Sequence, residues 1–376
     1  MKVDRPYRRA LRRGIALGLA LTAGWAIALT ADPPDPARPA MALLASQLHW
    51  DVEQERALTG WNRLVLAQSP VLAAGEEGVL RLRAERTEEE PSADPMEEDE
   101  NEERSEPDLQ PQRGEDGVVE MTARGKEEGK YLCGEGIYLY NRTDYALDAS
   151  VLTRGTVDVA MGEGPQILIV HTHGSEAYTQ TAGETYEESD PYRTTDCTHN
   201  VVKVGEEMAT VFRAHGFGVV HDTNLYDYPA YNGAYDRSGA AVADWLEQYP
   251  TIKVVLDVHR DALVGADGSV YKLISREAGE EAAQVMLVVG TDGSGAEHSR
   301  WQDNLAFAVA LQKELERGYH SLARPIVLRN SRYNQQMLPG SVLVEVGGHG
   351  NTLTEAIAGA RRWADNVART LLKMKG

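Results

Sequence analysis

Residues 166–176 read QILIVHTHGSE, and this stretch decides how the rest of the chain is interpreted. Its mostly apolar first half predicts a buried strand, which runs directly into two histidines and a carboxylate. Because alternate residues of a strand share a face, we expect His171 and His173 to point the same way, with Glu176 three residues beyond. Imidazole and carboxylate ligands are typical of zinc sites, and a catalytic site leaves one position open for water. The alternative is a pair of structural histidines at a strand end.

Two later stretches favour the metal site. Residues 251–261, TIKVVLDVHRD, repeat the pattern of an apolar strand that ends in a histidine, His259. Residues 341–348, SVLVEVGG, place Glu345 inside an apolar strand. A buried carboxylate is costly unless it is paired, bound to a metal or neutral. In an open α/β sheet the strand ends meet at one site, so we expect these side chains to lie together.

Strand and helix patterns alternate from residue 165 onward, which predicts an α/β domain with a mixed, mainly parallel sheet flanked by helices. A helix is expected over 200–215, ended by Gly216. Residues 270–275 and 284–289 are expected to form a pair of strands joined by a turn.

The N-terminal part has a different character. Residues 1–13 contain six Lys or Arg residues, and residues 14–31 are uncharged and apolar. This pattern predicts a membrane anchor with the basic side in the cytoplasm, and a cleaved signal peptide is the alternative. Either would place the remainder outside the cytoplasm. The expected organisation is a basic cytoplasmic tail (1–13), a transmembrane anchor (14–31), a juxtamembrane segment (32–84), an acidic disordered linker (85–128) and a single catalytic domain (129–376).

Charge and cysteine content exclude some functions. The net charge of −20 argues against binding nucleic acid through a general basic field, although much of it falls in the linker. The two cysteines cannot form a disulfide framework, so the histidines and carboxylates are the metal candidates.

Several motifs occur in order and resemble those of the stage II sporulation protein P family. The resemblance covers about residues 137–372 and is carried by HTHGSEAY from His171, DPYRTTD from Asp190, NVVKVG from Asn200, YPAYNGAYDRS from Tyr228, DVHRDA from Asp257, RYNQ from Arg332 and LVEVGG from Leu343.

This resemblance implies a zinc-dependent peptidoglycan hydrolase with a zinc amidase, or phosphorylase/hydrolase-like, fold. Such proteins are N-acetylmuramoyl-L-alanine amidases, with an endopeptidase activity on peptide cross-links also attributed to them, and they act on septal peptidoglycan during sporulation engulfment. The implied partners are a stage II sporulation protein D-type transglycosylase and a stage II sporulation protein M-type membrane protein. The implied location is the cell membrane, single-pass, with an extracytoplasmic catalytic domain. The alternatives are an exported zinc carboxypeptidase or deacylase, and a catalytically inactive wall-binding scaffold.

The same motifs suggest roles for individual residues. His259 is the firmest zinc ligand, and His171, His173 and Glu176 are the further candidates. His173 and Glu176 have a His-x-x-Glu spacing that is similar to that of zinc carboxypeptidases and related deacylases, and this analogy favours them as ligands, with His171 as their partner. The alternative is a carboxylate from the start of the following helix, as in amidases of similar chemistry, but that region holds Asp196, His199 and Asn200 and no Glu. Glu345 is the expected general base, the alternative being a structural carboxylate satisfied by Arg260 or Arg332.

Substrate contacts are expected from Arg332 and Asn334, which could bind the carboxylates or amides of a stem peptide, and from Arg260. The candidates for lining a groove for glycan or peptide are Tyr231, Asn232, Tyr235 and Arg237, with plain loop structure as the equal alternative.

Overall fold

The computed structural model describes residues 112–113, 118–125, 129–153, 163–265, 268–277 and 279–374. The expected tail 1–13, anchor 14–31 and segment 32–84, and most of the expected linker, lie outside these residues. No helix within the described ranges is both long enough and apolar enough to cross a membrane.

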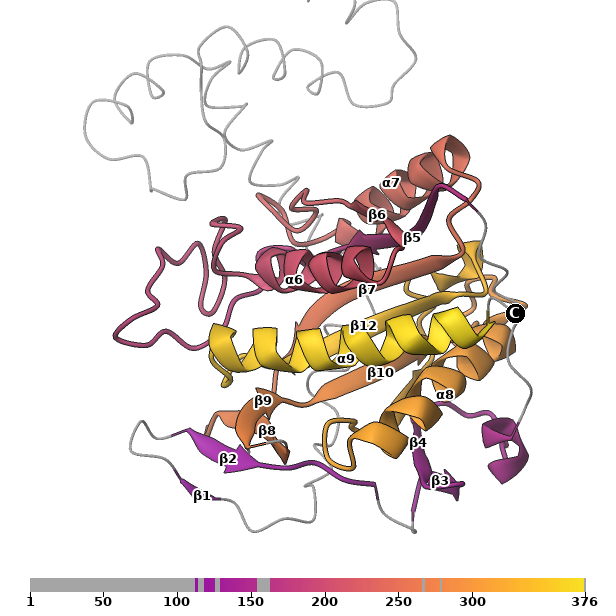
Figure 1. Cartoon of the computed structure of the whole chain (residues 1–376), viewed down its shortest axis with the longest axis horizontal. Coiled ribbons are helices and arrows are strands. Elements are labelled where there is room, and N and C mark those ends of the chain that lie inside the picture. Colours follow the sequence, from indigo (N-terminus) through magenta and orange to yellow (C-terminus); the bar gives the residue numbers. More distant parts are fainter. Residues whose placement is uncertain are drawn as a thin grey trace, which may run out of the picture. The chain divides into compact units, whose positions relative to one another are not determined.

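A mixed sheet of eight strands forms the centre of the described part, in the order β3-β4-β11-β10-β12-β7-β5-β6 (Figure 1). The strands span Tyr131–Gly134 (β3), Ile137–Asn141 (β4), Ile326–Arg329 (β11), Val285–Gly290 (β10), Ser341–Gly348 (β12), Val254–Asp261 (β7), Pro165–Val170 (β5) and Gly218–His221 (β6). Five of the seven neighbouring pairs are parallel, so the predicted mainly parallel sheet is confirmed.

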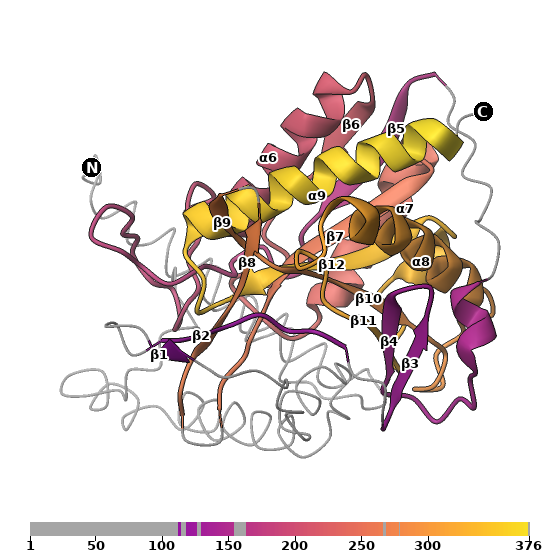
Figure 2. The same cartoon turned by 60° about the horizontal axis from the view of Figure 1, so that its bottom comes forward.

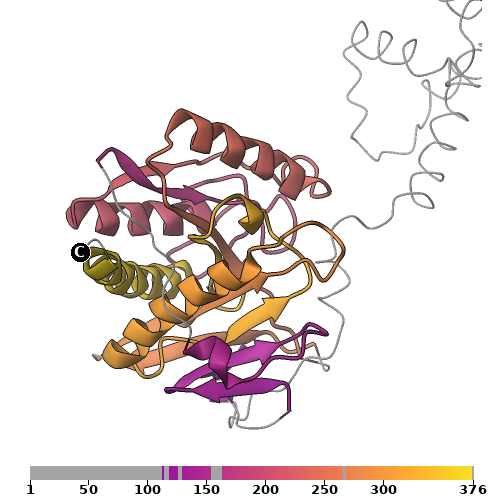
Figure 3. The same ribbon diagram turned by 90° about the vertical axis from the view of Figure 1, so that its right-hand side faces the viewer.

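Helices cover both faces of this sheet. The larger core lies under α6 (Val201–Ala214), α8 (Trp301–Gly318) and α9 (Leu353–Met374), whose buried residues pack against Ile167 and Leu256. The opposite face packs Leu168 and Val255 against α7 (Ala234–Gln248). Figure 3 shows α7 separated from α6 and α9, with the β3–β4 hairpin at one edge of the sheet. Strands covered on both sides are largely apolar on both faces, which is why residues 167–170 of β5 and residues 254–256 of β7 form apolar runs.

The helix expected over 200–215 forms as α6. Asn200 caps its N-terminus by accepting a hydrogen bond from the backbone N–H of Val202. Gly216 follows its end with a φ of 86°, a conformation that costs glycine little. A short 3-10 helix, Ala149–Leu152, precedes β5.

A second sheet of four strands corrects two expectations. Its order is β1-β2-β8-β9, with bounds Gln112–Arg113, Val119–Met121, Tyr271–Glu277 and Glu280–Ala283 (Figure 2). The pair expected from residues 270–275 and 284–289 was wrong: β8 turns back into β9, whereas β10 pairs antiparallel with β12 in the large sheet.

The folded part also begins before the expected boundary at residue 129. Strand β2 runs parallel to β8, and its Val119 and Met121 are buried. Ala123 then donates its backbone N–H to Gln284, at 2.6 Å. Residues 118–125 therefore do not belong to the disordered linker assigned to 85–128, because the apolar residues within this acidic stretch pair with strand β8 and become buried.

Candidate metal centre

Three of the predicted metal ligands meet in one place. His173, Glu176 and His259 are all buried, and each offers a ligand atom within 4.8 Å of the other two. Nδ1 of His173 lies 3.7 Å from Glu176 Oε1, and Nδ1 of His259 lies 3.5 Å from Glu176 Oε2. Ligand bonds of about 2.1 Å in a tetrahedral site separate the ligand atoms by about 3.4 Å, so two nitrogens and one carboxylate at these distances fit zinc.

The turn after β5 delivers two of these side chains. The chain leaves the sheet after Val170, and the backbone N–H of Glu176 closes the turn on the carbonyl of His173, at 3.2 Å. The carboxylate of Glu176 then accepts the backbone N–H of Arg260 at 3.1 Å, one residue beyond His259 on β7. A backbone donor thus fixes this carboxylate between the two imidazoles.

Charge within this cluster is arranged so that the carboxylate is ionised. Burial alone would raise the pKa of Glu176, but the hydrogen bond from His259 and the charges of Arg260 and Arg193 hold it well below its usual range. Burial also opposes protonation of His259, yet Asp257 and Glu176 outweigh it and raise the pKa of His259 well above the ordinary value. Two negative groups around one imidazole make this position attractive to a cation.

His173 responds differently because burial dominates there. Burial lowers its pKa to about 3, so at neutral pH the ring is the neutral form that can bind a metal. Its Nε2 is buried and has no hydrogen-bond partner within the described part of the chain. Tyr231 stacks on the ring at 4.5 Å between centroids, so this candidate groove residue does contact the site.

Glu345 lies beside the triad. It pairs directly with His259 across the parallel strands β12 and β7, and it is 7% exposed. Its Oε2 has no hydrogen-bond partner among the residues that the structure describes. Arg260, which was considered as a partner, donates instead to backbone carbonyls. Burial and the nearby Asp261 raise the pKa of Glu345 to about 8. Such an unpaired carboxyl next to a metal-ligand cluster is suited to accept and return a proton.

His171 does not join the cluster, which corrects its assignment as a metal ligand. Its Nδ1 lies 2.9 Å from the carbonyl of Val258, and its Nε2 lies 2.9 Å from Nε2 of His221. Strand alternation would have put His171 and His173 on one face, but β5 ends at Val170 and the turn that follows separates them. The ring of His171 packs instead under α6, where a Cβ at Gly205 would approach it to 2.5 Å.

Two of the three predicted substrate contacts hold the structure together instead. Arg260 donates to the carbonyls of Ala177 and Tyr192 and so clamps the loop that follows the first ligands. Asn334 donates to the carbonyl of Tyr235 on α7, at 2.8 Å. Arg332 is half-buried. Burial lowers the pKa of the nearby His298, and the charge of Arg332 lowers it further.

Arg193 is a site residue that sequence reasoning did not select. Its guanidinium lies 2.7 Å from Asp227 and 3.7 Å from Glu176, and it stands 4.8 Å above the ring of Tyr231. Arg193 and Tyr231 both lie in motifs that carry the family resemblance, DPYRTTD and YPAYNGAYDRS, and these motifs were the sequence signal that could have identified Arg193 as a site residue.

Another groove candidate, Arg237, has a structural role, since it donates to the carbonyls of its own loop at Tyr226, Ala230 and Asn232.

Comparisons with known proteins place this fold and site in context. N-acetylmuramyl-L-alanine amidase of Mycobacterium smegmatis is 15% identical, with 58% of this chain and 99% of that chain covered and a TM-score of 0.35. The corresponding amidase of Clostridium difficile 630 is 13% identical, with 56% and 97% covered and a TM-score of 0.32. At these scores the likeness does not bear on the activity of this chain.

Sequence similarity is more specific. Stage II sporulation protein P of Bacillus subtilis (strain 168) is 27% identical over 216 residues, which are 54% of this chain. The match spans about half of the length of that relative, 50%. The sequence model of the family described as stage II sporulation protein P (SpoIIP) matches residues 63–368. Since that match covers most of the chain, including every residue of the metal centre, the protein belongs to the stage II sporulation protein P family.

Proposed function

We propose that this protein is a zinc-dependent cell-wall hydrolase, an N-acetylmuramoyl-L-alanine amidase that separates stem peptides from the glycan of peptidoglycan. The observation that carries the proposal is the buried His173–Glu176–His259 cluster with the unpaired carboxyl of Glu345 on the adjacent strand. Membership of the family supports the wall as substrate. Cleavage of peptide cross-links by the same site is the finer alternative, because both reactions hydrolyse an amide.

His173, Glu176 and His259 would hold the metal. A zinc ion bound there would lower the pKa of a water molecule and polarise the scissile carbonyl. Glu345 would accept a proton from the attacking water as the new C–O bond forms, and would then pass it to the nitrogen of the departing amine as the C–N bond breaks. Burial raises the pKa of the Glu345 carboxyl in the metal-free chain to about 8, and a zinc ion bound beside it would lower that pKa, so that the carboxylate could accept the proton at neutral pH.

Arg332 remains our candidate for contact with a substrate carboxylate. Its side chain is half-buried on the loop after β11, and a guanidinium can bind a carboxylate through two parallel hydrogen bonds. By contrast, Arg260 and Asn334 are occupied with backbone groups and are not proposed again.

The sequence and the family together support a proposal for the cellular setting. We propose a membrane-anchored protein whose catalytic part faces the extracytoplasmic septal space during engulfment, and which works with a stage II sporulation protein D-type transglycosylase and a stage II sporulation protein M-type membrane protein. The basic and apolar residues of 1–31 support the anchor. Protease treatment of intact sporulating cells without their outer wall should digest the residues beyond 31, and their protection would contradict this topology.

The decisive experiment is digestion of purified peptidoglycan by the full chain, read by mass spectrometry. Intact stem peptides released with zinc, and lost after a chelator or in Glu345→Gln, are the expected result. Release of single amino acids would instead indicate a carboxypeptidase, and release of fragments cut within the cross-links would indicate an endopeptidase. A zinc-loaded chain that cleaves neither intact nor transglycosylase-treated wall would refute the enzymatic assignment and favour a wall-binding scaffold.

A further inference from the structure

A buried carboxylate that has no part in the proposed chemistry lies directly behind a metal-ligand candidate. Asp257 is 7% exposed and precedes His259 by two residues on β7, so both side chains lie on the same face of the strand. Its Oδ1 is 3.0 Å from Nε2 of His259, as an ion-pair contact rather than a well-aligned hydrogen bond. The two nitrogens of His259 thus face different groups: Nδ1 faces Glu176 and Nε2 faces Asp257.

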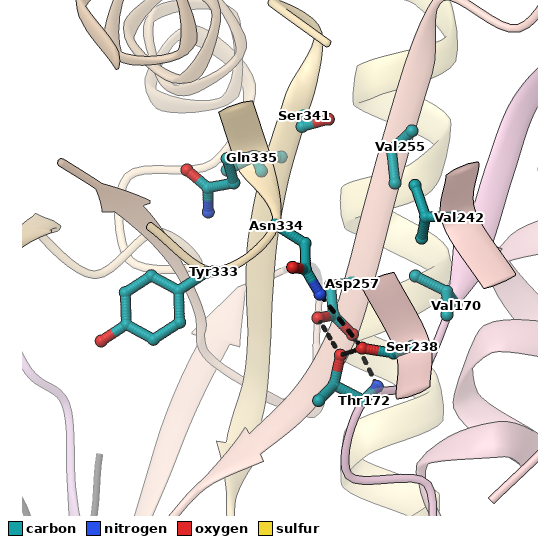
Figure 4. Close-up of a pocket in the computed structure, with 11 residues that line it drawn as sticks. Val170, Thr172, Ser238, Val242, Val255, Asp257, Tyr333, Asn334, Gln335 and Ser341 are labelled. Atoms are coloured by element: carbon teal, nitrogen blue, oxygen red, sulfur yellow. Dashed lines mark hydrogen bonds between the residues drawn. The ribbon is translucent and has the colours of Figure 1, made fainter. Parts of the chain in front are cut away.

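Asp257 is itself held firmly by the turn that carries the other ligands. The backbone N–H of Thr172 donates to its Oδ1 at 2.8 Å, and the hydroxyl of Thr172 donates to its Oδ2 at 2.6 Å. This hydroxyl lies 2.7 Å from that of Ser238 on α7, to which Asn334 donates at 3.2 Å (Figure 4). Thr172 and Ser238 are fully buried, so these contacts are sheltered from water.

The arrangement has a cost that folding alone does not explain. Removing a carboxylate from water is expensive, and here the two hydrogen bonds from Thr172 and the contact with His259 offset it. If the role were only to end β5, a neutral acceptor would bind the Thr172 N–H equally well. A negative charge facing Nε2, however, keeps the imidazole proton on that nitrogen and leaves the lone pair of Nδ1 for an ion.

We propose that Asp257 is a positioning residue that fixes the tautomer and ring orientation of His259 for metal binding, and that Thr172 in turn holds Asp257. This inference rests on the proposed metal site. It means that Thr172, between His171 and His173 in sequence, couples the turn bearing His173 and Glu176 to the strand bearing His259. The turn and the strand are thereby connected through the side chain of Thr172, which is not itself a proposed ligand of the metal or the substrate.

The test is metal affinity of the full chain, measured by competition of zinc against a chromophoric chelator. Asp257→Asn keeps the shape and an acceptor for Thr172 but removes the charge, and it should weaken zinc binding by about 10- to 100-fold. Thr172→Val should give a smaller loss, and Thr172→Ser, which restores the hydroxyl, should recover the wild-type affinity. Asp222→Asn is the matched control: Asp222 is also buried but bonds to Asn224, Tyr226 and Trp245, so affinity should be unchanged.

A second measurement separates positioning from folding. In the cobalt-loaded chain, the exchangeable ring proton of His259 should give a shifted NMR signal that is sharp in the wild type and broadened or lost in Asp257→Asn. Equal zinc affinity and an unchanged proton signal in Asp257→Asn would overturn the inference while leaving the proposed function intact. If that variant does not fold, unchanged affinity and signal in Thr172→Val overturn it equally. A wild-type chain that binds no zinc would instead refute the proposed function and this inference with it.

Discussion

Glu345 offers a test of the site that needs neither substrate nor metal. Burial, followed by the charge of Asp261, raises the pKa of Glu345 in the folded chain from its ordinary value of 4.5 to about 8. Because the folded chain binds this proton more tightly than the unfolded chain does, stability should be lost as the pH rises from about 4.5 through about 8. Each pKa unit is worth about 1.4 kcal/mol, so the loss between pH 5 and pH 9 is about 3 to 5 kcal/mol from this group alone.

The perturbation is Glu345→Gln, which resembles the protonated carboxyl and cannot ionise. Near pH 5 the metal-free variant and wild type should have similar free energies of unfolding, and at pH 9 the variant should be more stable by about 3 to 5 kcal/mol. Urea unfolding of both chains at several pH values measures the difference, in which other titrating groups largely cancel. Zinc should reduce the pH dependence, since a nearby cation favours the ionised carboxylate.

Asp222→Asn provides the control for this series. Burial would raise the pKa of Asp222, but hydrogen bonds from Asn224, Trp245 and Tyr226 lower it below its ordinary value of 3.8. The contribution of Asp222 to stability is therefore complete above about pH 5. The stability difference between this variant and wild type should therefore stay constant from pH 5 to pH 9. A pH-independent difference for Glu345→Gln as well would show that Glu345 is not the buried, unpaired acid described here.

Three further predictions concern neighbouring residues. His173→Ala and His259→Ala should each abolish stoichiometric zinc binding. His171→Ala should retain zinc binding but lose about 1 to 3 kcal/mol of stability, because the partners of its buried ring are left unsatisfied. Metal analysis measures the zinc content of each variant, and urea unfolding measures its stability. Gly205→Ala places a Cβ 2.5 Å from the His171 ring and should cost about 1 to 3 kcal/mol, seen as a lower melting temperature at unchanged zinc stoichiometry; an unaltered melt would contradict this packing. Arg193→Gln leaves the buried carboxylate of Asp227 without its ion pair, which should cost about 2 to 4 kcal/mol in urea unfolding, and a neutral effect would show that the 2.7 Å contact contributes nothing.

The sequence by itself determined the sheet and the chemical nature of the site. The apolar run before His171, and the run before His259 that only Asp257 interrupts, specify strands buried on both faces, and such strands place their polar ends at one edge of a parallel sheet. A carboxylate within the apolar run around Glu345 also indicated a special role, because an unpaired charge is rarely buried without one. These signals are local, so they can be seen without knowing how the chain folds.

Only the tertiary structure decided which of the expected ligands lie together in the candidate metal centre. His171 and His173 are equivalent by alternation, and the choice between them depends on where β5 ends and on the hydrogen bonds that Val258 and His221 offer to His171. Arg260 resembled a substrate ligand until its carbonyl acceptors became visible. Such partners lie tens of residues away in the sequence, and their pairing depends on the packing of the whole domain. For the same reason β10, expected beside β8, pairs with β12 in the large sheet instead.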